Sequence, residues 1–211
     1  MPTLNSPVGN AIPNDPPRGL RVGLLGGSFN PAHDGHVHIS KLALDRLKLD
    51  QVWWLVSPQN PLKAPGDMAA LDDRLEGARA IALDARIRVG AIERDLGTRY
   101  TVDSLAALKR HFPGVRFVWI MGADILHQMP QWKRWRSVFR LVPIAVFARS
   151  SYSLGAVSGL AARKFAKAEI STLRAPRLAN AKPPAWVFLK TPLHDASATQ
   201  IRAGTVQSHT K

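Results

Sequence analysis

Short, almost uninterrupted apolar runs alternate with amphipathic helical patterns along most of this chain. The runs are rich in Val, Ile, Leu and Trp, and in the stretches between them apolar residues recur every three or four positions. A strand that is apolar on both faces needs cover on both faces, which a parallel sheet with crossover helices provides. The alternation therefore predicts an α/β fold with a doubly wound, mostly parallel sheet.

The predicted elements are spaced as consecutive strand and helix units. Strands are expected at 21–25, 51–57, 87–91, 116–121, 143–148 and 186–189, and helices at 35–47, 71–84, 101–111 and 132–139. A basic, alanine-rich segment at 150–184 is interpreted as helix plus loop. With 211 residues the chain is long enough for one well-buried domain and too short for two with separate cores.

The two ends of the chain lack this periodicity. Residues 1–18 are rich in Pro and Asn and are expected to form a flexible N-terminal arm, followed by a single domain over 19–204 and a polar C-terminal tail at 205–211. The sequence shows neither the pattern of a secretory signal nor a run of about 18 apolar residues that could span a membrane. With no cysteine, disulfides and thiolate chemistry are excluded. We therefore expect a cytoplasmic protein that does not associate with membranes.

The chain carries a formal net charge of +14, from 29 Lys and Arg against 15 Asp and Glu. Such a field attracts anions, among them nucleotides, polyphosphates and nucleic acid. The basic residues are spread through positions 134–177 rather than gathered with aromatic residues in one recognition helix. Nucleic-acid binding is therefore not expected.

The turn after the first predicted strand, GGSFNPAHDGH at 26–36, is the candidate site of chemistry. Gly26 and Gly27 let the backbone approach a ligand closely, and His33 and His36 lie one helical turn apart at the start of a helix. Backbone amides and two imidazoles around one space suit a chain of phosphates. The chain has neither GxGxxG at this point nor the Lys-Ser/Thr pair of a P-loop, so the turn must bind phosphate differently. A zinc site formed with His38 is disfavoured because HExxH is missing.

Three segments together resemble a known family. GGSFNPAHDGH resembles the GGxFxPxHxGH motif of the nucleotidyltransferase superfamily, and SATQIR at 197–202 resembles its second motif, SxTxIR at a helix start. IMGADIL at 120–126, followed by Trp132, is similar to the GxDxL…W segment of the nicotinate mononucleotide adenylyltransferases. The resemblance covers 20–203 and implies a Rossmann-like nucleotidyltransferase fold.

The resemblance implies transfer of AMP from ATP to nicotinate mononucleotide, giving nicotinate adenine dinucleotide and pyrophosphate on the route to NAD. The attacking phosphate oxygen is already ionised, so the site must align two anions and stabilise charge rather than supply a base. His33, His36 and Arg202 are the implied catalytic residues and are expected to supply positive charge. Mg2+ is expected with ATP, held mainly by the ATP phosphates rather than by protein ligands.

The resemblance also implies two sets of binding residues. In the first set, His36 would donate to the α-phosphate and Arg202 would hold the β- and γ-phosphates. The ATP set is Gly26, Gly27, Ser28, Phe29, His33, His36, Gly122, Asp124, Ser197, Thr199 and Arg202, and the mononucleotide set is Asn60, Lys63, Tyr100, Thr101 and Trp132. The Trp would stack on the pyridine ring and Asp124 would contact a ribose. Ser197 and Thr199 could equally be helix caps.

Other functions stay open at this point. Nicotinamide mononucleotide or pantetheine phosphate could be the acceptor, although the positive net charge favours the carboxylate-bearing nicotinate form. Lys133 stands where the family often has an aromatic residue and could add positive potential near that carboxylate. A basic nucleic-acid-binding module on the same fold is a further alternative. The sequence indicates no particular oligomeric state.

Overall fold

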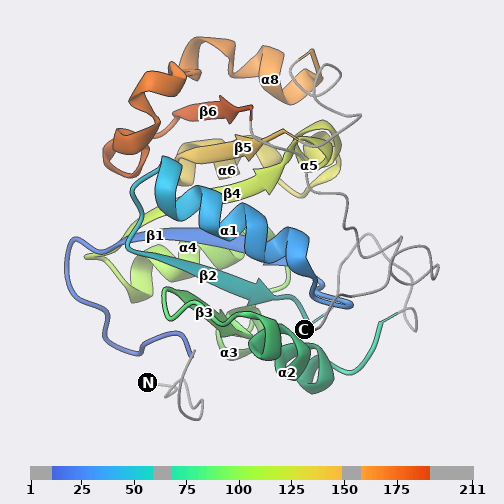
Figure 1. The fold of residues 1–211 in the computed structure, drawn as a ribbon. Helices are drawn as coiled ribbons and strands as arrows, with labels where there is room; N and C mark the ends of the chain where they lie inside the picture. Colours follow the sequence, from blue (N-terminus) through green and yellow to red (C-terminus); the bar gives the residue numbers. More distant parts are fainter. Residues whose placement is uncertain (1–10, 59–67, 149–157, 191–211) are drawn as a thin grey trace.

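The computed structural model describes residues 11–58, 68–148 and 158–190. Within these ranges six strands form one sheet, all neighbours pairing in parallel, in the order β3-β2-β1-β4-β5-β6 (Figure 1). The strands are β1 Arg21–Gly27, β2 Gln51–Val56, β3 Ile87–Gly90, β4 Arg116–Gly122, β5 Ile144–Phe147 and β6 Trp186–Leu189. The predicted α/β fold with a doubly wound parallel sheet is confirmed.

The apolar runs form strands that are buried on both faces of the sheet. Trp53 and Trp54 are neighbours in β2, their side chains point to opposite faces, and both are fully buried. The first belongs to the hydrophobic core on one side of the sheet and the second to the core on the other side. A strand of this kind cannot lie at a solvated face, which is why the sheet needs two helical layers.

Helices cover both faces (Figure 1). Among the described residues, three helices pack into one core and five pack into the other. The first layer holds α1 Asp34–Arg46, α2 Leu71–Ile81 and η3 Thr172–Asn180. The second holds α3 Ile92–Asp95, α4 Thr101–His111, α5 Ala123–Gln128, α6 Trp135–Leu141 and α8 Leu160–Lys164, with the short turns η1 Met129–Gln131 and η2 Ala166–Ala168.

The helix predicted at 132–139 begins three residues later than the sequence suggests. Trp132 has extended backbone angles, and Arg134 is left-handed with φ 48°, so the chain turns before α6 starts at Trp135. A residue in the left-handed conformation cannot be part of a regular right-handed helix. Trp132 therefore lies on a connection rather than on a helix.

Part of the predicted N-terminal arm packs on the domain. Ala11 forms a parallel bridge with Val89, and Ile12 is buried beside Gly90 of β3. Residues 1–10 and the tail 205–211 lie outside the described residues, and the predicted domain limits stay predictions. Of the helices in the described ranges, none combines the length and apolarity that a bilayer crossing requires.

Candidate functional site

The predicted phosphate-binding turn lies where the strand order reverses. From β1 the chain proceeds outward through β2 and β3 on one side, whereas β4, β5 and β6 extend on the other side (Figure 1). The register pairs Leu25 with Ile120, so Gly27 at the end of β1 and Gly122 at the end of β4 reach the same edge. Ligands of doubly wound sheets bind beyond the carboxyl ends of the strands at such a switch point.

Phe29 shapes the turn from inside the core. Its φ is 46°, a left-handed conformation that is costly for a residue with a side chain. The ring is only 2% exposed and lies 5.1 Å from the Trp54 ring in a stacked arrangement and 4.6 Å from the His36 ring. These contacts hold the strained backbone in place, and the Phe29 ring packs against the ring of His36.

His33 and His36 are tied together by a reciprocal cap at the start of α1. His33 is the N-cap residue, and its Nδ1 accepts a hydrogen bond of 3.1 Å from the Gly35 N–H. Nδ1 of His36 accepts one of 3.2 Å from the His33 N–H, and the ring centroids lie 3.9 Å apart. In a neutral imidazole whose Nδ1 accepts a hydrogen bond, the proton is carried on Nε2. The backbone N–H groups thus engage Nδ1 of both rings, and the role of the two imidazoles toward phosphate stays a prediction.

The same cap uses backbone amides that the sequence suggested for phosphate. The Gly35 N–H donates to the His33 ring, and the His36 N–H donates to the His33 carbonyl oxygen at 2.8 Å. Asp34 in the first turn adds a negative charge near the positive end of the helix dipole. The amides of Gly35 and His36 are therefore engaged within the cap itself.

Gly26 makes room for Trp119 of the adjacent strand. A Cβ at position 26 would lie 2.5 Å from Cη2 of Trp119, which no real contact allows. A Cβ at Gly27 would meet the Phe29 ring at an ordinary 3.4 Å. The Trp119 ring is buried and lies edge-on to Trp132, with 6.3 Å between centroids. Glycine at 26 is therefore required by packing, and Trp119 joins the turn to Trp132.

The structure also brings together part of the predicted mononucleotide set. Tyr100 immediately precedes α4, whose first residue is Thr101. Nζ of Lys133, next to Trp132, lies 4.1 Å from the centroid of the Tyr100 ring and 3.7 Å from a carboxylate oxygen of Asp103. Residues 100–101 and 132–133 thus form one neighbourhood that carries aromatic surface and a cation.

The remaining predicted residues divide into two groups. Gly122 ends β4 and is the N-cap position of α5, and Asp124 stands in the first turn of that helix, at the same sheet edge as Gly27. Asn60, Lys63, Ser197, Thr199 and Arg202 lie outside the described residues. The approach of Arg202 to the histidines therefore stays a prediction.

Arg74 of α2 is a residue of the site that the sequence reading missed. It is 4% exposed, and its guanidinium donates to four carbonyl oxygens. Burial lowers its pKa. It stands in the apolar stripe of α2 with Leu71, Leu75 and Ala78, and a charge in such a stripe is the signal that could have identified it.

Glu93 of α3 is a second buried charge near this edge that the sequence reading missed. It is 8% exposed, and burial raises the pKa of its carboxyl group, partly offset by hydrogen bonds from Ser57 and Ser104. Ser57 directly follows β2. Glu93 thus contacts the carboxyl end of β2 from the α3 side of the sheet.

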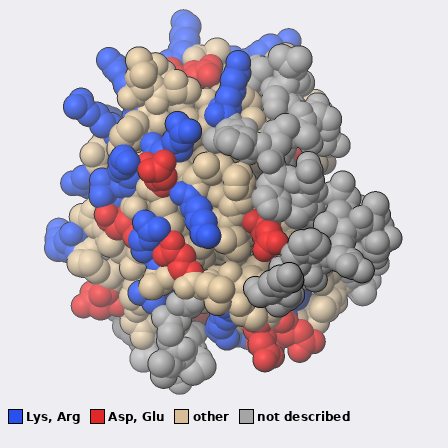
Figure 2. Space-filling view, in the orientation of Figure 1, with Lys and Arg blue, Asp and Glu red and all other residues tan. Residues whose placement is uncertain are grey.

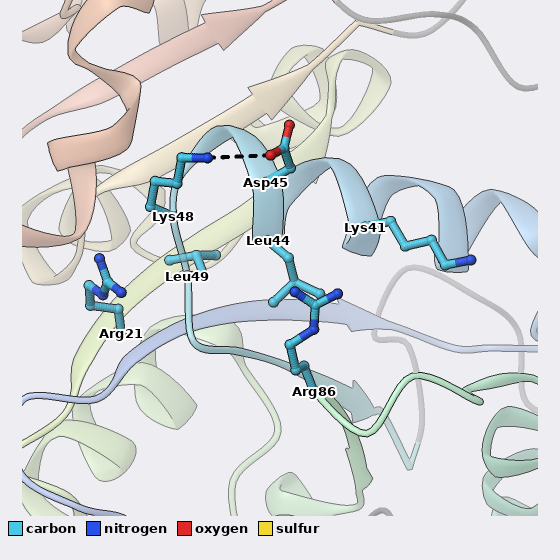
Figure 3. Close-up of a pocket in the computed structure, with 7 residues that line it drawn as sticks. All are labelled: Arg21, Lys41, Leu44, Asp45, Lys48, Leu49 and Arg86. Atoms are coloured by element: carbon cyan, nitrogen blue, oxygen red, sulfur yellow. Dashed lines mark hydrogen bonds and ion pairs between the residues drawn. The ribbon is translucent and has the colours of Figure 1, made fainter.

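A cavity of about 410 Å³ lies at the opposite edge of the sheet (Figure 3). It is lined by Arg21, Lys41, Leu44, Asp45, Lys48, Leu49 and Arg86. Three of its cations are paired with carboxylates: Arg21 with Asp50 at 2.6 Å, Arg86 with Asp84 at 2.7 Å, and Lys48 with Asp45 at 3.4 Å. The Arg21 and Arg86 partners hold the pKa values of Asp50 and Asp84 below their usual range. These internal pairs make the cavity a poor anion site.

The surface charge is dispersed on the face in view. Figure 2 shows Lys and Arg side chains scattered over it with Asp and Glu between them. Among the described residues there is no group of three or more His, Cys, Asp or Glu suited to hold a metal ion.

Comparisons with known proteins agree with this geometry. The model of the cytidylyltransferase-like family matches residues 24–204. A protein of Parvibaculum lavamentivorans named "Probable nicotinate-nucleotide adenylyltransferase" is 53% identical over 184 residues, covering 87% of this chain and 92% of that protein. A protein of the same name from Methylorubrum extorquens is 51% identical over 183 residues, covering 87% and 99%. The nicotinic acid mononucleotide adenylyltransferase of Plasmodium falciparum, solved with NaAD, matches the fold with a TM-score of 0.65 at 14% identity, covering 87% of this chain and 83% of that one.

Proposed function

The chain belongs to the cytidylyltransferase-like family and, within it, to the nicotinate-nucleotide adenylyltransferases, and from this membership we propose how its site works. The reaction transfers AMP from ATP to nicotinate mononucleotide and yields nicotinate adenine dinucleotide and pyrophosphate. A phosphate oxygen of the mononucleotide attacks the α-phosphorus, and the bond from that phosphorus to the α,β-bridging oxygen breaks. The electron pair leaves with pyrophosphate. Because the nucleophile is already an anion, no general base is needed.

The histidine pair would stabilise the charge that develops on the transferred phosphate. With Nδ1 occupied by the cap, the Nε2–H of His36 is the donor for the α-phosphate, and His33 adds a second donor beside it. Such donors serve this purpose because a hydrogen bond to a developing anion strengthens as the charge grows. Gly26, Gly27, Ser28 and Phe29 shape the turn rather than contribute charge.

The remaining positive charge would come from Arg202 and from the substrate. Arg202 would hold the β- and γ-phosphates, with Ser197 and Thr199 adding hydroxyl and amide donors. Magnesium would enter as part of MgATP, since the described residues offer no carboxylate cluster of their own. Asp124 would contact the ribose of the adenylate.

The acceptor would bind on the side of Tyr100, Thr101 and Trp132. The pyridine ring would stack on Trp132, whose extended backbone places it outside the regular helix. Asn60 and Lys63 would meet the mononucleotide phosphate. Lys133 over the Tyr100 ring supports preference for the acid form, because this exposed cation, shared with Asp103 at 3.7 Å, would attract the carboxylate of the nicotinate ring.

One observation carries the proposal: two imidazoles whose Nδ1 atoms accept backbone hydrogen bonds lie 3.9 Å apart, between ring centroids, at the switch point of the sheet. The test is pyrophosphate release from MgATP in the presence of nicotinate mononucleotide, nicotinamide mononucleotide or pantetheine phosphate. Release is expected with the nicotinate form, with the dinucleotide identified by mass. Absence of release with that acceptor, or a clear preference for pantetheine phosphate, would overturn the proposal. Salt-dependent RNA binding without turnover would favour the nucleic-acid alternative. Cytoplasmic location stays a prediction from the sequence.

A further inference from the structure

Arg74 donates hydrogen bonds to carbonyl oxygens from separate parts of the chain. Its Nη1 donates to the carbonyl oxygens of Ser28 at 2.6 Å and Ser57 at 2.8 Å. Its Nη2 donates to Pro58 at 3.0 Å, and its Nε donates to Ala69 at 2.9 Å. No carboxylate forms an ion pair with Arg74 among the residues that the structure describes. The positive charge of the guanidinium thus interacts with backbone carbonyl dipoles.

These carbonyl groups belong to two connections that meet at the candidate site. Ser28 lies in the turn between β1 and α1, directly after the GG pair at 26–27 and five residues before His33. Ser57 and Pro58 lie directly after β2, and Ala69 lies just before α2, so they are the two described ends of the β2–α2 connection. A second bond joins the same parts, because Oδ1 of Asn30 accepts from the Ala69 N–H at 3.3 Å.

Burying a guanidinium to hold backbone segments together costs desolvation free energy. An ionised side chain removed from water is strongly unfavourable unless its donors are satisfied, and the lowered pKa of Arg74 reflects that burial. What a guanidinium offers in return is several donors in one rigid plane, a geometry that the single ammonium of a lysine does not reproduce. Four oxygens held by one plane cannot move independently of one another.

We propose that Arg74 is a positioning residue that sets the distance between the histidine turn and the carboxyl end of β2. The inference rests on the proposed function, in which the turn holds ATP and the β2–α2 connection leads to the acceptor side. Transfer of AMP requires the attacking oxygen and the α-phosphorus to be aligned, and a misplacement of about 1 Å can reduce turnover about a hundredfold. Loss of the shared plane would therefore lower the rate of transfer more than the binding of either substrate.

The test is steady-state kinetics of Arg74→Lys in the pyrophosphate-release assay, with both substrates varied. We expect kcat to fall at least about tenfold, with KM for ATP changing by less than about threefold, because alignment is lost while the contacts of the turn remain. Arg79→Lys is the matched control, since it makes the same change on the same helix without the carbonyl bonds. Leu178→Ala on η3 controls for stability alone, because it opens a buried site in the same core away from the turn.

Several outcomes would overturn the inference. One is a kcat of Arg74→Lys within about twofold of the wild-type value. Another is a decrease in kcat no greater than that of Leu178→Ala, when both variants are compared under conditions in which the same fraction of each is unfolded. If Arg74→Lys does not fold, Arg74→Gln decides, since it keeps a hydrogen-bond donor at this position but removes the charge and the rigid plane of the guanidinium. An unchanged kcat in that variant would then overturn the inference. Wild-type turnover is measured in the same series, so a failure of the proposed function is seen separately.

Discussion

The two roles of His36 can be separated by substitution. Its Nδ1 completes the cap by accepting the His33 N–H, and its Nε2–H is the proposed donor to the α-phosphate. His36→Ala removes both roles. His36→Glu keeps the first, since glutamate at the third helical position accepts from the cap residue, and replaces the donor by a negative charge.

The contacts of His36 allow the losses of stability and of turnover in His36→Ala to be estimated. Losing the cap bond costs about 1 kcal/mol, and losing the ring contacts with Phe29 and His33 costs about 0.5–1.5 kcal/mol more. For a chain of this length, a total of roughly 2 kcal/mol corresponds to a Tm lower by about 4–8 °C. Losing one transition-state donor reduces kcat about a hundredfold, or about 2.7 kcal/mol. His36→Ala should therefore show both losses.

The discriminating measurement is the order of the two variants in two assays. Urea unfolding should find His36→Glu more stable than His36→Ala, because its carboxylate restores the cap and favours the helix dipole. Pyrophosphate release should place His36→Glu below His36→Ala, because a carboxylate repels the triphosphate. If activity instead followed stability, with the Glu variant more active than the Ala variant, His36 would act through the helix cap and the assignment of its Nε2–H would be wrong.

Three further outcomes are expected elsewhere in the structure. Gly26→Ala should lower the free energy of unfolding by about 1–3 kcal/mol in urea titrations, because the added Cβ would meet Trp119 at 2.5 Å, and a neutral effect would show that the ring can move away. Glu93 has a pKa raised above its ordinary 4.5, so it favours folding at acid pH, and this contribution is lost as pH rises through the raised value. Glu93→Gln should remove that part of the pH dependence in unfolding curves, and an unchanged curve would contradict the burial argument. Lys133→Met should reduce the ratio of kcat/KM for the nicotinate over the nicotinamide acceptor, and a constant ratio would remove Lys133 from the choice of substrate.

The strands could be predicted because burial on both faces leaves a signal in the sequence itself. Paired Trp53 and Trp54 are apolar in succession, as expected for a strand covered on both faces, and the helix at Thr101–His111 was predicted at its observed limits. The start of α6 was wrong because Trp132, Trp135 and Phe139 have helical spacing. Arg134 interrupts this spacing with a left-handed backbone. Because arginine is a residue that favours helices, the sequence gives no indication of that conformation.

The site was only partly visible from the sequence. The spacing of His33 and His36 predicted that they lie together, and they do. Their mutual cap was not foreseen, because histidine is rarely an N-cap residue and each ring was interpreted as a cation. Arg74 was missed because its neighbours Asp72, Asp73 and Glu76 make that stretch look like a solvated helix face.

The cap at the start of α1 also bears on how ATP is received. Each imidazole is held by a backbone bond and by neighbouring rings before any nucleotide arrives. Fixing a rotatable side chain at the moment of association costs about 0.5–1.5 kcal/mol, and here that entropy is already lost during folding. The turn is therefore preorganised, and its contribution to affinity does not depend on an induced rearrangement of these two rings.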